Sequence, residues 1–435
     1  MELEISRWFK DNSDEIAEIS ERIFNLAEAA YEEHNSSKTI ADYLASYGFK
    51  TESGIGGMPT AFRSRWGKGK PVIGFLGEYD ALPGLNQGRE PYYTGDKSRN
   101  GHGCGHNLLG AGSAAAAAAL ARALEAQGRQ GTIVYYGCPA EETLEGKIKM
   151  MEAGCFKELD AALSWHPLDC NMAGEAKYQV MDSIEFAFTG VYAHAAVEPH
   201  LGRSALDACE LMNVGVNYLR EHVPDDVRMH YCYLNAGEKP NIVPGYARVL
   251  YYIRNKDRRV LDDVTARVTK VAEGAALMTG TEVSARVRIR GSETILNNKL
   301  IQHLYEIMTQ IDIPEYTDEE KEFMKVLAKN AGLPAAAGEL CREINPPTGK
   351  PVDIGGSTDL SSVSQIVPTG FIFTSCLPKG VSLHHWACTA CAGSSVGNKG
   401  MLYAAKVLAQ CGYDLIADEA LLEQVKKAYL ETQEG

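Results

Sequence analysis

The chain has 435 residues, 45% of them apolar and 23% charged, with 42 Gly and 17 Pro. This composition excludes a disordered chain and a collagen-like repeat, and the length predicts two domains. The 43 Lys and Arg residues against 57 Asp and Glu residues give a net charge of −14. We therefore expect no nucleic-acid partner, because the average field of the protein repels a phosphate backbone.

The N-terminal sequence has neither the basic region nor the apolar region of a secretion signal, and no run of about 18 uncharged apolar residues occurs in the chain. The eleven cysteines are an odd number and lack the short, regular spacing of a disulfide framework. We expect a cytoplasmic protein with reduced thiols and no membrane partner.

Helical spacing of apolar residues follows a plausible N-cap at residues 12–13 and runs to residue 30. A second, shorter helical pattern covers residues 36–48. The apolar run at 72–76 is too short for a buried helix and predicts a fully buried strand. It is followed by a polar, glycine-containing stretch at 84–105.

Helices and strands then alternate along the chain. The pattern predicts a helix at 107–124, a strand at 132–137, a helix at 147–153 and a strand at 161–165. Further along, it predicts a helix at 318–330, a strand at 370–374 and a final pair of helices. This alternation is typical of an α/β fold with a mostly parallel central sheet.

A different pattern begins near residue 184. Ile184, Phe186 and Phe188 alternate with other residues as in a half-exposed strand. The order of the elements that follow is β-α-β-β-α-β, which is that of a ferredoxin-like, split βαβ domain: strand from 184, helix 204–223, strands 229–234 and 247–254, helix 260–278, and strand 282–289. We therefore expect residues 184–292 to be an inserted domain, with 1–183 and 293–435 forming the domain around it.

Side chains that can bind metal or move protons follow three of the predicted strands. Open parallel sheets bind ligands at the carboxyl ends of their strands, so we expect these side chains to converge. Two more candidates precede the alanine-rich helix, whose N-terminus should favour a thiolate. The candidates are Asp80, Glu141, Glu142 and His166 after strands, and Cys104 and His106 before the helix.

Each of these side chains alone is more often structural than functional. As a set, however, Cys, His and carboxylate are the donors of Zn and neighbouring transition metals, and Cys-x-His in a loop aims both donors the same way. The sequence therefore predicts a metal site. Because adjacent residues after a strand cannot both point at one atom, we expect one of Glu141 and Glu142 to bind metal and the other to act as a base.

Six segments, in this order and spacing, resemble a metallohydrolase family. They are GEYDALPG, GHGCGHNLLG, CPAEET, SWHP, GVYAHAAVEPHLGRSALDA and LHHWA. The family contains aminoacylase, carboxypeptidase G and carnosine dipeptidase, and the resemblance runs over nearly the whole chain. Within the family, the chain is most similar to the cysteine-containing amidohydrolases of hippurate and auxin conjugates. The resemblance implies a zinc-exopeptidase-like catalytic domain with an inserted lid and dimerisation domain.

The resemblance also implies roles for individual residues. Two divalent cations per subunit, Mn or Zn, would be held by Cys104, His106, Glu142, His166 and His384, with Cys104 as the bridging thiolate. Glu141 would be the general base and acid, and Asp80 would orient a ligand. His194 would belong to the neighbouring subunit and would stabilise the oxyanion. Asn241 and Arg254 align with positions that contact the substrate carboxylate, although a structural ion pair is an equal alternative for Arg254.

The implied function is hydrolysis of the amide that joins an acyl or aroyl group to an amino acid, as in p-aminobenzoyl-glutamate. A dipeptidase or carboxypeptidase of the same fold is one alternative, and a non-catalytic partner subunit is another. We expect a homodimer, with a hetero-oligomer of related subunits as the alternative. His385 competes with His384 for the last ligand position, and we prefer His384. We interpret Cys388 and Cys391 as two buried thiols, because a single CxxC is weak evidence for a metal site.

Overall fold

The computed structural model describes residues 2–334 and 338–434 of the chain. Contacts divide the chain into two compact units. Unit 1 comprises Met1–Ala176, Ile295–Val352 and Ser362–Gly435. Unit 2 comprises Lys177–Thr294 and Asp353–Ser361.

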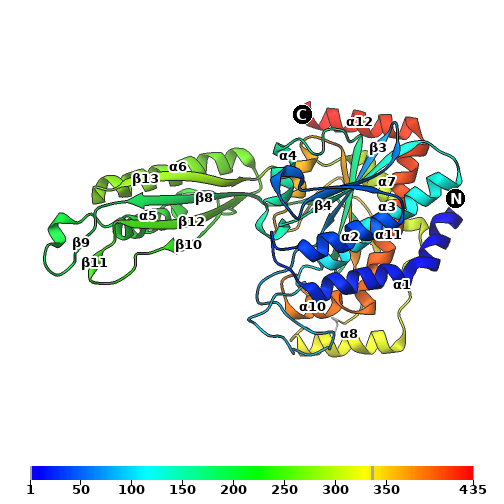
Figure 1. Cartoon of the computed structure of the whole chain (residues 1–435), viewed down its shortest axis with the longest axis horizontal. Helices are drawn as coiled ribbons and strands as arrows, with labels where there is room; N and C mark the ends of the chain where they lie inside the picture. Colours follow the sequence, from blue (N-terminus) through cyan, green and yellow to red (C-terminus); the bar gives the residue numbers. More distant parts are fainter. Residues whose placement is uncertain (1, 335–337, 435) are drawn as a thin grey trace. The chain divides into compact units, whose positions relative to one another are not determined.

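The core of unit 1 is an eight-stranded sheet (Figure 1). Four of its inner strands, β4, β3, β5 and β16, run parallel to one another, which confirms the predicted mostly parallel sheet. In spatial order the strands are β1 (Lys50–Ser53), β2 (Phe62–Lys68), β4 (Gly131–Cys138), β3 (Val72–Glu78), β5 (Ala161–Leu168), β16 (Thr369–Ser375), β6 (Asn171–Ala173) and β14 (Ile344–Asn345).

Four strands of this sheet were not predicted: β1, β2 and the short strands β6 and β14. β1 and β2 pair antiparallel to each other, and β2 pairs antiparallel to β4. All four residues of β1 are exposed, and β2 contains three basic residues, so neither strand carries the apolar run that marks the buried strands. The two remaining short strands near the unit boundary are β7 (Ala176–Lys177) and β15 (Val352–Asp353).

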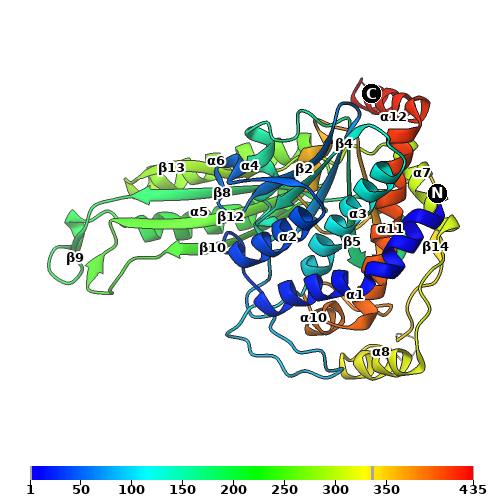
Figure 2. The same ribbon diagram turned by 45° about the vertical axis from the view of Figure 1, so that its right-hand side comes forward.

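Helices cover this sheet, and α3, α7 and α11 pack against its strands while α1 packs along α3 and α11 (Figure 2). The helices are α1 (Glu2–Leu26), α2 (His34–Ser46), α3 (His106–Ala126), α4 (Gly146–Glu152), α7 (Asn298–Gln310), α8 (Asp318–Asn330), α9 (Leu360–Ser364), α10 (Trp386–Ala392), α11 (Ser395–Ala417) and α12 (Glu419–Glu434). The predicted helices at 36–48, 107–124, 147–153 and 318–330 are confirmed to within a few residues.

The prediction for the first helix was wrong at both ends. The helix starts at Glu2 rather than after an N-cap at 12–13, because Ile5 and Phe9 extend the apolar stripe and are buried in the core. It ends at Leu26 rather than near residue 30, because Ala27 takes a left-handed conformation with φ of 44°.

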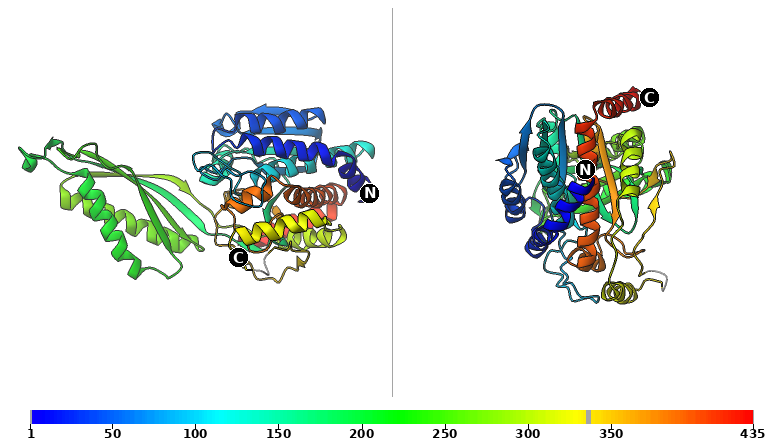
Figure 3. Two further views of the ribbon diagram at one scale, coloured as in Figure 1. Left: turned by 90° about the horizontal axis from the view of Figure 1, so that it is seen from below. Right: turned by 90° about the vertical axis from the view of Figure 1, so that its right-hand side faces the viewer.

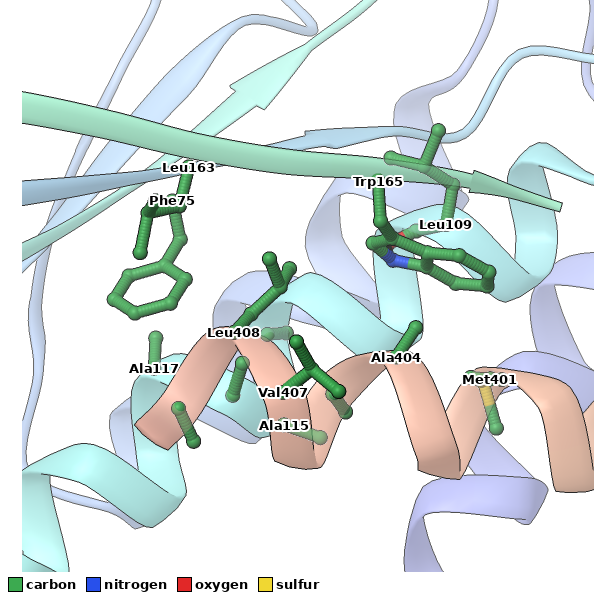
Figure 4. Packing of buried hydrophobic residues seen from close by; sticks show 14 of the residues in the cluster. Phe75, Leu109, Ala115, Ala117, Leu163, Trp165, Met401, Ala404, Val407 and Leu408 are labelled. Carbon is green, nitrogen blue, oxygen red and sulfur yellow. Dashed lines mark hydrogen bonds between the residues drawn. The ribbon is translucent and has the colours of Figure 1, made fainter. Parts of the chain in front are cut away.

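The alanine-rich helix α3 lies at the centre of unit 1. It is long and apolar enough to span a membrane, but 94% of its apolar window is buried inside the protein. Its small side chains let α11 and the sheet approach closely, so that residues such as Ala115 and Ala117 pack beneath Val407 and Leu408 (Figure 4). α3 is therefore a core helix, and its N-terminal end carries His106.

Unit 2 is built on a four-stranded antiparallel sheet in the order β10-β12-β8-β13. Its helices α5 and α6 both lie on one face of this sheet (Figure 3). A small two-stranded ribbon of β9 and β11 adjoins them in the chain. The elements are β8 (Val180–Thr189), β9 (Ala193–His194), α5 (Ala205–Leu219), β10 (Arg228–Asn235), β11 (Ile242–Val243), β12 (Tyr246–Asn255), α6 (Arg258–Thr279) and β13 (Glu282–Arg290).

The prediction that the strand at residues 184–188 is half exposed was wrong. Ile184, Phe186 and Phe188 do face the core, but the alternate position Glu185 is also buried. Its carboxylate accepts hydrogen bonds from Arg248 and Arg288 on the two flanking strands, and these side chains cover the polar face. β8 is an inner strand of the sheet, so both of its edges are paired, and the arginine side chains of the neighbouring strands cover its polar face.

Two helical glycines offer a test of how closely α3 packs against the end of β3. A Cβ at Gly110 would lie 2.5 Å from the backbone oxygen of Glu78, whereas a Cβ at the exposed Gly274 of α6 would meet nothing within 4 Å. We expect Gly110→Ala to lower stability by about 1–3 kcal/mol through steric overlap. Gly274→Ala should raise it by about 0.5–1 kcal/mol through helix propensity. Thermal unfolding of both variants checks this, and equal shifts would contradict it.

Candidate metal centre

The candidate residues of unit 1 lie at the carboxyl ends of its parallel strands. Asp80 follows β3, Glu141 and Glu142 follow β4, and His166 is near the end of β5. His384 lies in the segment between β16 and α10. Because these strands are neighbours in the sheet, their ends bring the side chains together, as the sequence predicted.

The loop before α3 delivers Cys104 and His106 to the same place. Gly105 caps the helix with a φ of 76°, and a Cβ there would lie 2.7 Å from the ring of Pro167. Glycine at this position therefore allows the left-handed turn and the close approach of the loop to β5. The turn places Cys104 Sγ 3.5 Å from His166 Nε2.

Two groups of donor atoms share one residue. In each group the atoms all lie within 4.8 Å of one another, as is needed to surround a single cation. Cys104 belongs to both groups. The first group is Cys104, His106 and His166, and the second is Cys104, Glu142 and His384.

The chemistry of these donors fits a divalent cation. His106 Nε2 and Glu142 Oε1 are buried and have no hydrogen-bond partner, although buried polar atoms are nearly always paired. Burial lowers the pKa of His166 to about 4, assisted by the neighbouring His106, so the ring is held in the neutral form that binds metals. A cation would provide the missing partner for each atom.

The expectation that the helix N-terminus favours the thiolate of Cys104 differs from what the structure shows. Burial, together with the negative charge of Glu142, raises the pKa of the Cys104 thiol far above its usual range. The effect of burial therefore outweighs that of the helix, and the thiolate requires a nearby cation.

Asp80 connects two donor segments. It is 1% exposed, and its Oδ1 lies 2.8 Å from His106 Nδ1 while its Oδ2 accepts a hydrogen bond of 2.9 Å from the backbone N–H of Glu142. Because Nδ1 of His106 is bonded to Asp80, Nε2 is the ring atom that faces the donor group. Asp80 can therefore fix both a ring orientation and the loop that carries the adjacent carboxylates.

The adjacent carboxylates Glu141 and Glu142 point to different places, in agreement with the sequence argument. Glu142 joins Cys104 and His384, whereas Glu141 groups with His106, with its Oε2 3.8 Å from His106 Nε2. Ala140, just before them, has a left-handed φ of 56°. This turn explains how consecutive residues reach separate positions.

The turn at Ala140 is held by a residue that sequence reasoning missed. The buried carboxylate of Glu33 accepts a hydrogen bond of 2.8 Å from the Ala140 N–H. Burial, with the negative charge of Asp80 adding to it, raises the pKa of Glu33 to about 7. Glu33 lies 107 residues from its partner, so no local pattern in the sequence indicates the contact.

Glu78 and Lys147 were also missed. Glu78, the last residue of β3, forms a third donor group with His106 and Glu141. Its other oxygen lies 2.6 Å from Nζ of Lys147, whose side chain is completely buried. Lysine is rarely buried, so the pattern KIKMME predicts only a helix with solvated lysines.

The two adjacent histidines before α10 have separate positions. His384 has a left-handed φ of 58°, donates its N–H to Gly103 O over 2.7 Å, and lies with its Nε2 3.3 Å from Glu142 Oε2. His385 instead caps α10 by accepting from the Ala387 N–H. The structure thus brings His384, rather than His385, into the donor group.

Cys388 and Cys391 lie inside α10, where both are buried and free, which agrees with the interpretation as core thiols.

The other three candidate residues belong to unit 2. His194 is exposed and lies on β9, where its Nδ1 accepts from the Ala196 N–H. Asn241 is exposed and directly precedes β11. Arg254 is half buried on β12, its Nε has no hydrogen-bond partner, and no acidic side chain among the described residues pairs with it. The alternative that Arg254 forms a structural ion pair therefore finds no support.

Comparison with known proteins identifies the family. The model of peptidase family M20/M25/M40 matches residues 74–390. The chain is 38% identical to one of the subunits of p-aminobenzoyl-glutamate hydrolase from Escherichia coli, covering 95% of this chain and 91% of the relative. It is 31% identical to Xaa-Arg dipeptidase of Mus musculus, covering 98% and 93%.

The fold agrees with these matches. A Bacillus subtilis structure described as a dinuclear metal binding peptidase of the M20 family aligns with a TM-score of 0.59 and 17% identity, covering 92% of this chain and 99% of that one. The predicted resemblance is confirmed, and the chain is a metal-dependent hydrolase of amide bonds. It belongs to peptidase family M20/M25/M40.

Proposed function

We propose that this protein is a two-metal amidohydrolase that cleaves the amide between an acyl or aroyl group and an amino acid, with p-aminobenzoyl-glutamate as the first substrate to test. The observation that carries the proposal is that two donor groups share Cys104 while Glu141 lies beside them. The name of the 38% identical E. coli relative, which identifies it as part of p-aminobenzoyl-glutamate hydrolase, supports the choice of substrate.

Cys104, His106 and His166 would hold one divalent ion, and Cys104, Glu142 and His384 would hold the other. The mixture of thiolate, imidazole and carboxylate suits Zn and Mn, with the soft thiolate favouring Zn. Ions bound there would polarise the amide carbonyl and lower the pKa of a water molecule.

Glu141 is placed to move the proton in this reaction. It is not part of either group that shares Cys104, so its carboxylate would accept a proton from the attacking water and deliver it to the departing amine. Asp80 would keep the ring of His106 in position throughout.

Arg254 and Asn241 would bind the carboxylate of the amino-acid portion. The half-buried guanidinium of Arg254 lies over the ring of Tyr252 and has no acidic partner among the described side chains. Burial lowers the pKa of Arg254, because it costs free energy to hold the charged guanidinium away from water. A substrate carboxylate would offset that cost through paired hydrogen bonds.

We further propose a homodimer in which His194 of the neighbouring subunit stabilises the oxyanion. β10 is an edge strand of the unit 2 sheet, and Tyr231 and Tyr233 on it are each 39% exposed. Tyr218 of the nearby helix α5 is 75% exposed. An edge strand flanked by exposed aromatic residues is suited to pairing with a second copy. A hetero-oligomer remains the alternative, because the chain is also 27% identical, over 61% of its length, to the other type of subunit of the E. coli hydrolase.

The proposed location is the cytoplasm. All eleven cysteines lie within the described residues and none of them forms a disulfide bond there, as expected in a reducing compartment.

The function is tested by assaying the purified chain alone, after chelator treatment, with Mn²⁺ or Zn²⁺ added back. We expect no activity without metal, and release of glutamate from p-aminobenzoyl-glutamate or of an amino acid from a related N-acyl conjugate with metal. Xaa-Arg dipeptides are assayed in parallel, because of the 31% identical dipeptidase. Preference for the dipeptides would favour the dipeptidase alternative, and inactivity toward all substrates would favour a non-catalytic role.

Glu141→Gln tests the proton-transfer role. The amide keeps the shape of the side chain but cannot accept the proton, so we expect kcat to fall at least about 100-fold while metal content is unchanged. Glu152→Gln, at an exposed position on α4, is the matched control and should keep wild-type activity. A near-normal rate for Glu141→Gln would show that another group is the base.

Complementation between two inactive variants tests the shared site. His194→Ala should lower turnover without loss of metal, and so should Glu141→Gln. If sites are shared across a homodimer, a mixed dimer contains one site with both residues intact, so mixing should restore up to about a quarter of wild-type activity. His200→Ala, at a nearby exposed histidine, should remain active by itself. Absence of rescue after subunit exchange would contradict the shared site.

A further inference from the structure

Glu78 and Lys147 form a completely buried ion pair beside the candidate metal centre. Lys147 Nζ lies 2.6 Å from Glu78 Oε1, and the two residues are 0% and 3% exposed. Burial of two charges is costly, and replacement of such a pair by apolar residues is often neutral or stabilising. Stability alone therefore gives no reason for this pair.

The second oxygen of Glu78 faces His106. Glu78 Oε2 lies 3.3 Å from His106 Nε2, yet both atoms are buried and neither makes a hydrogen bond. Two donors, each bonded at about 2.1 Å to one cation in tetrahedral or octahedral geometry, are about 3.0–3.4 Å apart. The separation and the missing hydrogen bond fit two ligands of one ion.

Charge balance points in the same direction. The proposed centre contains the Cys104 thiolate and four carboxylates, which carry five negative charges in a buried place; the carboxylates are Glu78, Asp80, Glu141 and Glu142. Two divalent ions supply four positive charges. The ammonium of Lys147 supplies a fifth positive charge, which offsets the charge of Glu78.

We propose that Glu78 is a ligand of the ion held by His106, and that Lys147 is a positioning residue that binds the opposite carboxylate oxygen and turns Oε2 toward that ion. This inference rests on the two-metal centre proposed above. It adds a protein carboxylate to the Cys104, His106 and His166 group, which otherwise has a single negative donor.

The test is titration of metal-free enzyme with Co²⁺, followed by visible absorption and by counting bound ions per chain. For Glu78→Gln we expect one of two ions to bind at least tenfold more weakly, with an altered cobalt spectrum, and the other ion to bind normally. Lys147→Met should weaken the same ion. The double variant Glu78→Gln/Lys147→Met removes both charges of the pair, so it keeps the test valid if a single variant fails to fold.

Lys149→Met is the matched control, because it removes a lysine and its 2.7 Å ion pair with Glu145 from the same helix, at a more exposed position. It should bind both ions as wild type does. If Glu78 had a purely structural role, Glu78→Gln would have a lower unfolding temperature but an unchanged cobalt affinity and spectrum.

Wild-type affinity for both ions in Glu78→Gln and in the double variant would overturn the assignment of Glu78. Normal affinities in Lys147→Met would overturn the positioning role. Failure of the underlying two-metal centre is distinguishable, because the wild-type chain itself would then bind fewer than two Co²⁺.

Discussion

Negative charge concentrated at one buried edge of a parallel sheet is the constraint on which this structure depends. A thiol, several carboxylates and three histidines meet there, and three of their polar atoms lack hydrogen-bond partners. In the low-dielectric interior, such a cluster is strongly unfavourable unless positive charge compensates it. The protein supplies positive charge of its own on Lys147, and the donor chemistry calls for metal ions to supply more.

The backbone around the cluster is held in conformations that isolated peptides rarely adopt. Ala140 and His384 have positive φ angles without being glycine, which costs of order 1–3 kcal/mol each. Both are tied down by hydrogen bonds, Ala140 to Glu33 and His384 to the Gly103 carbonyl. The segments that carry the donors are therefore fixed by residues outside the donor groups, which prepares the geometry before any ion binds.

The sequence pattern placed most of the candidate side chains at this edge, because each of them follows an apolar strand or precedes a helical run, whereas only the family resemblance indicated His384. Asp80 and His166 could be placed at the sheet edge from the buried strands alone. Glu33, Glu78 and Lys147 could not, because their roles depend on partners 107, 28 and 69 residues away and on a degree of burial that charged residues rarely have. Likewise the polar strands β1 and β2 are specified by pairing, β2 with β4 and β1 with β2, rather than by a pattern of their own.

The donors of the cluster lie between residues 78 and 384, so a metal ion would join segments that are very distant in the chain. An ion that binds only the folded protein stabilises it by mass action. In theory, a link that closes long loops stabilises the fold more than one that closes short loops. The buried charge works in the opposite sense, since it disfavours the folded chain without metal. Metal binding and folding of unit 1 are therefore thermodynamically coupled, because the same ions that would supply the chemistry also neutralise the charge that the fold brings together.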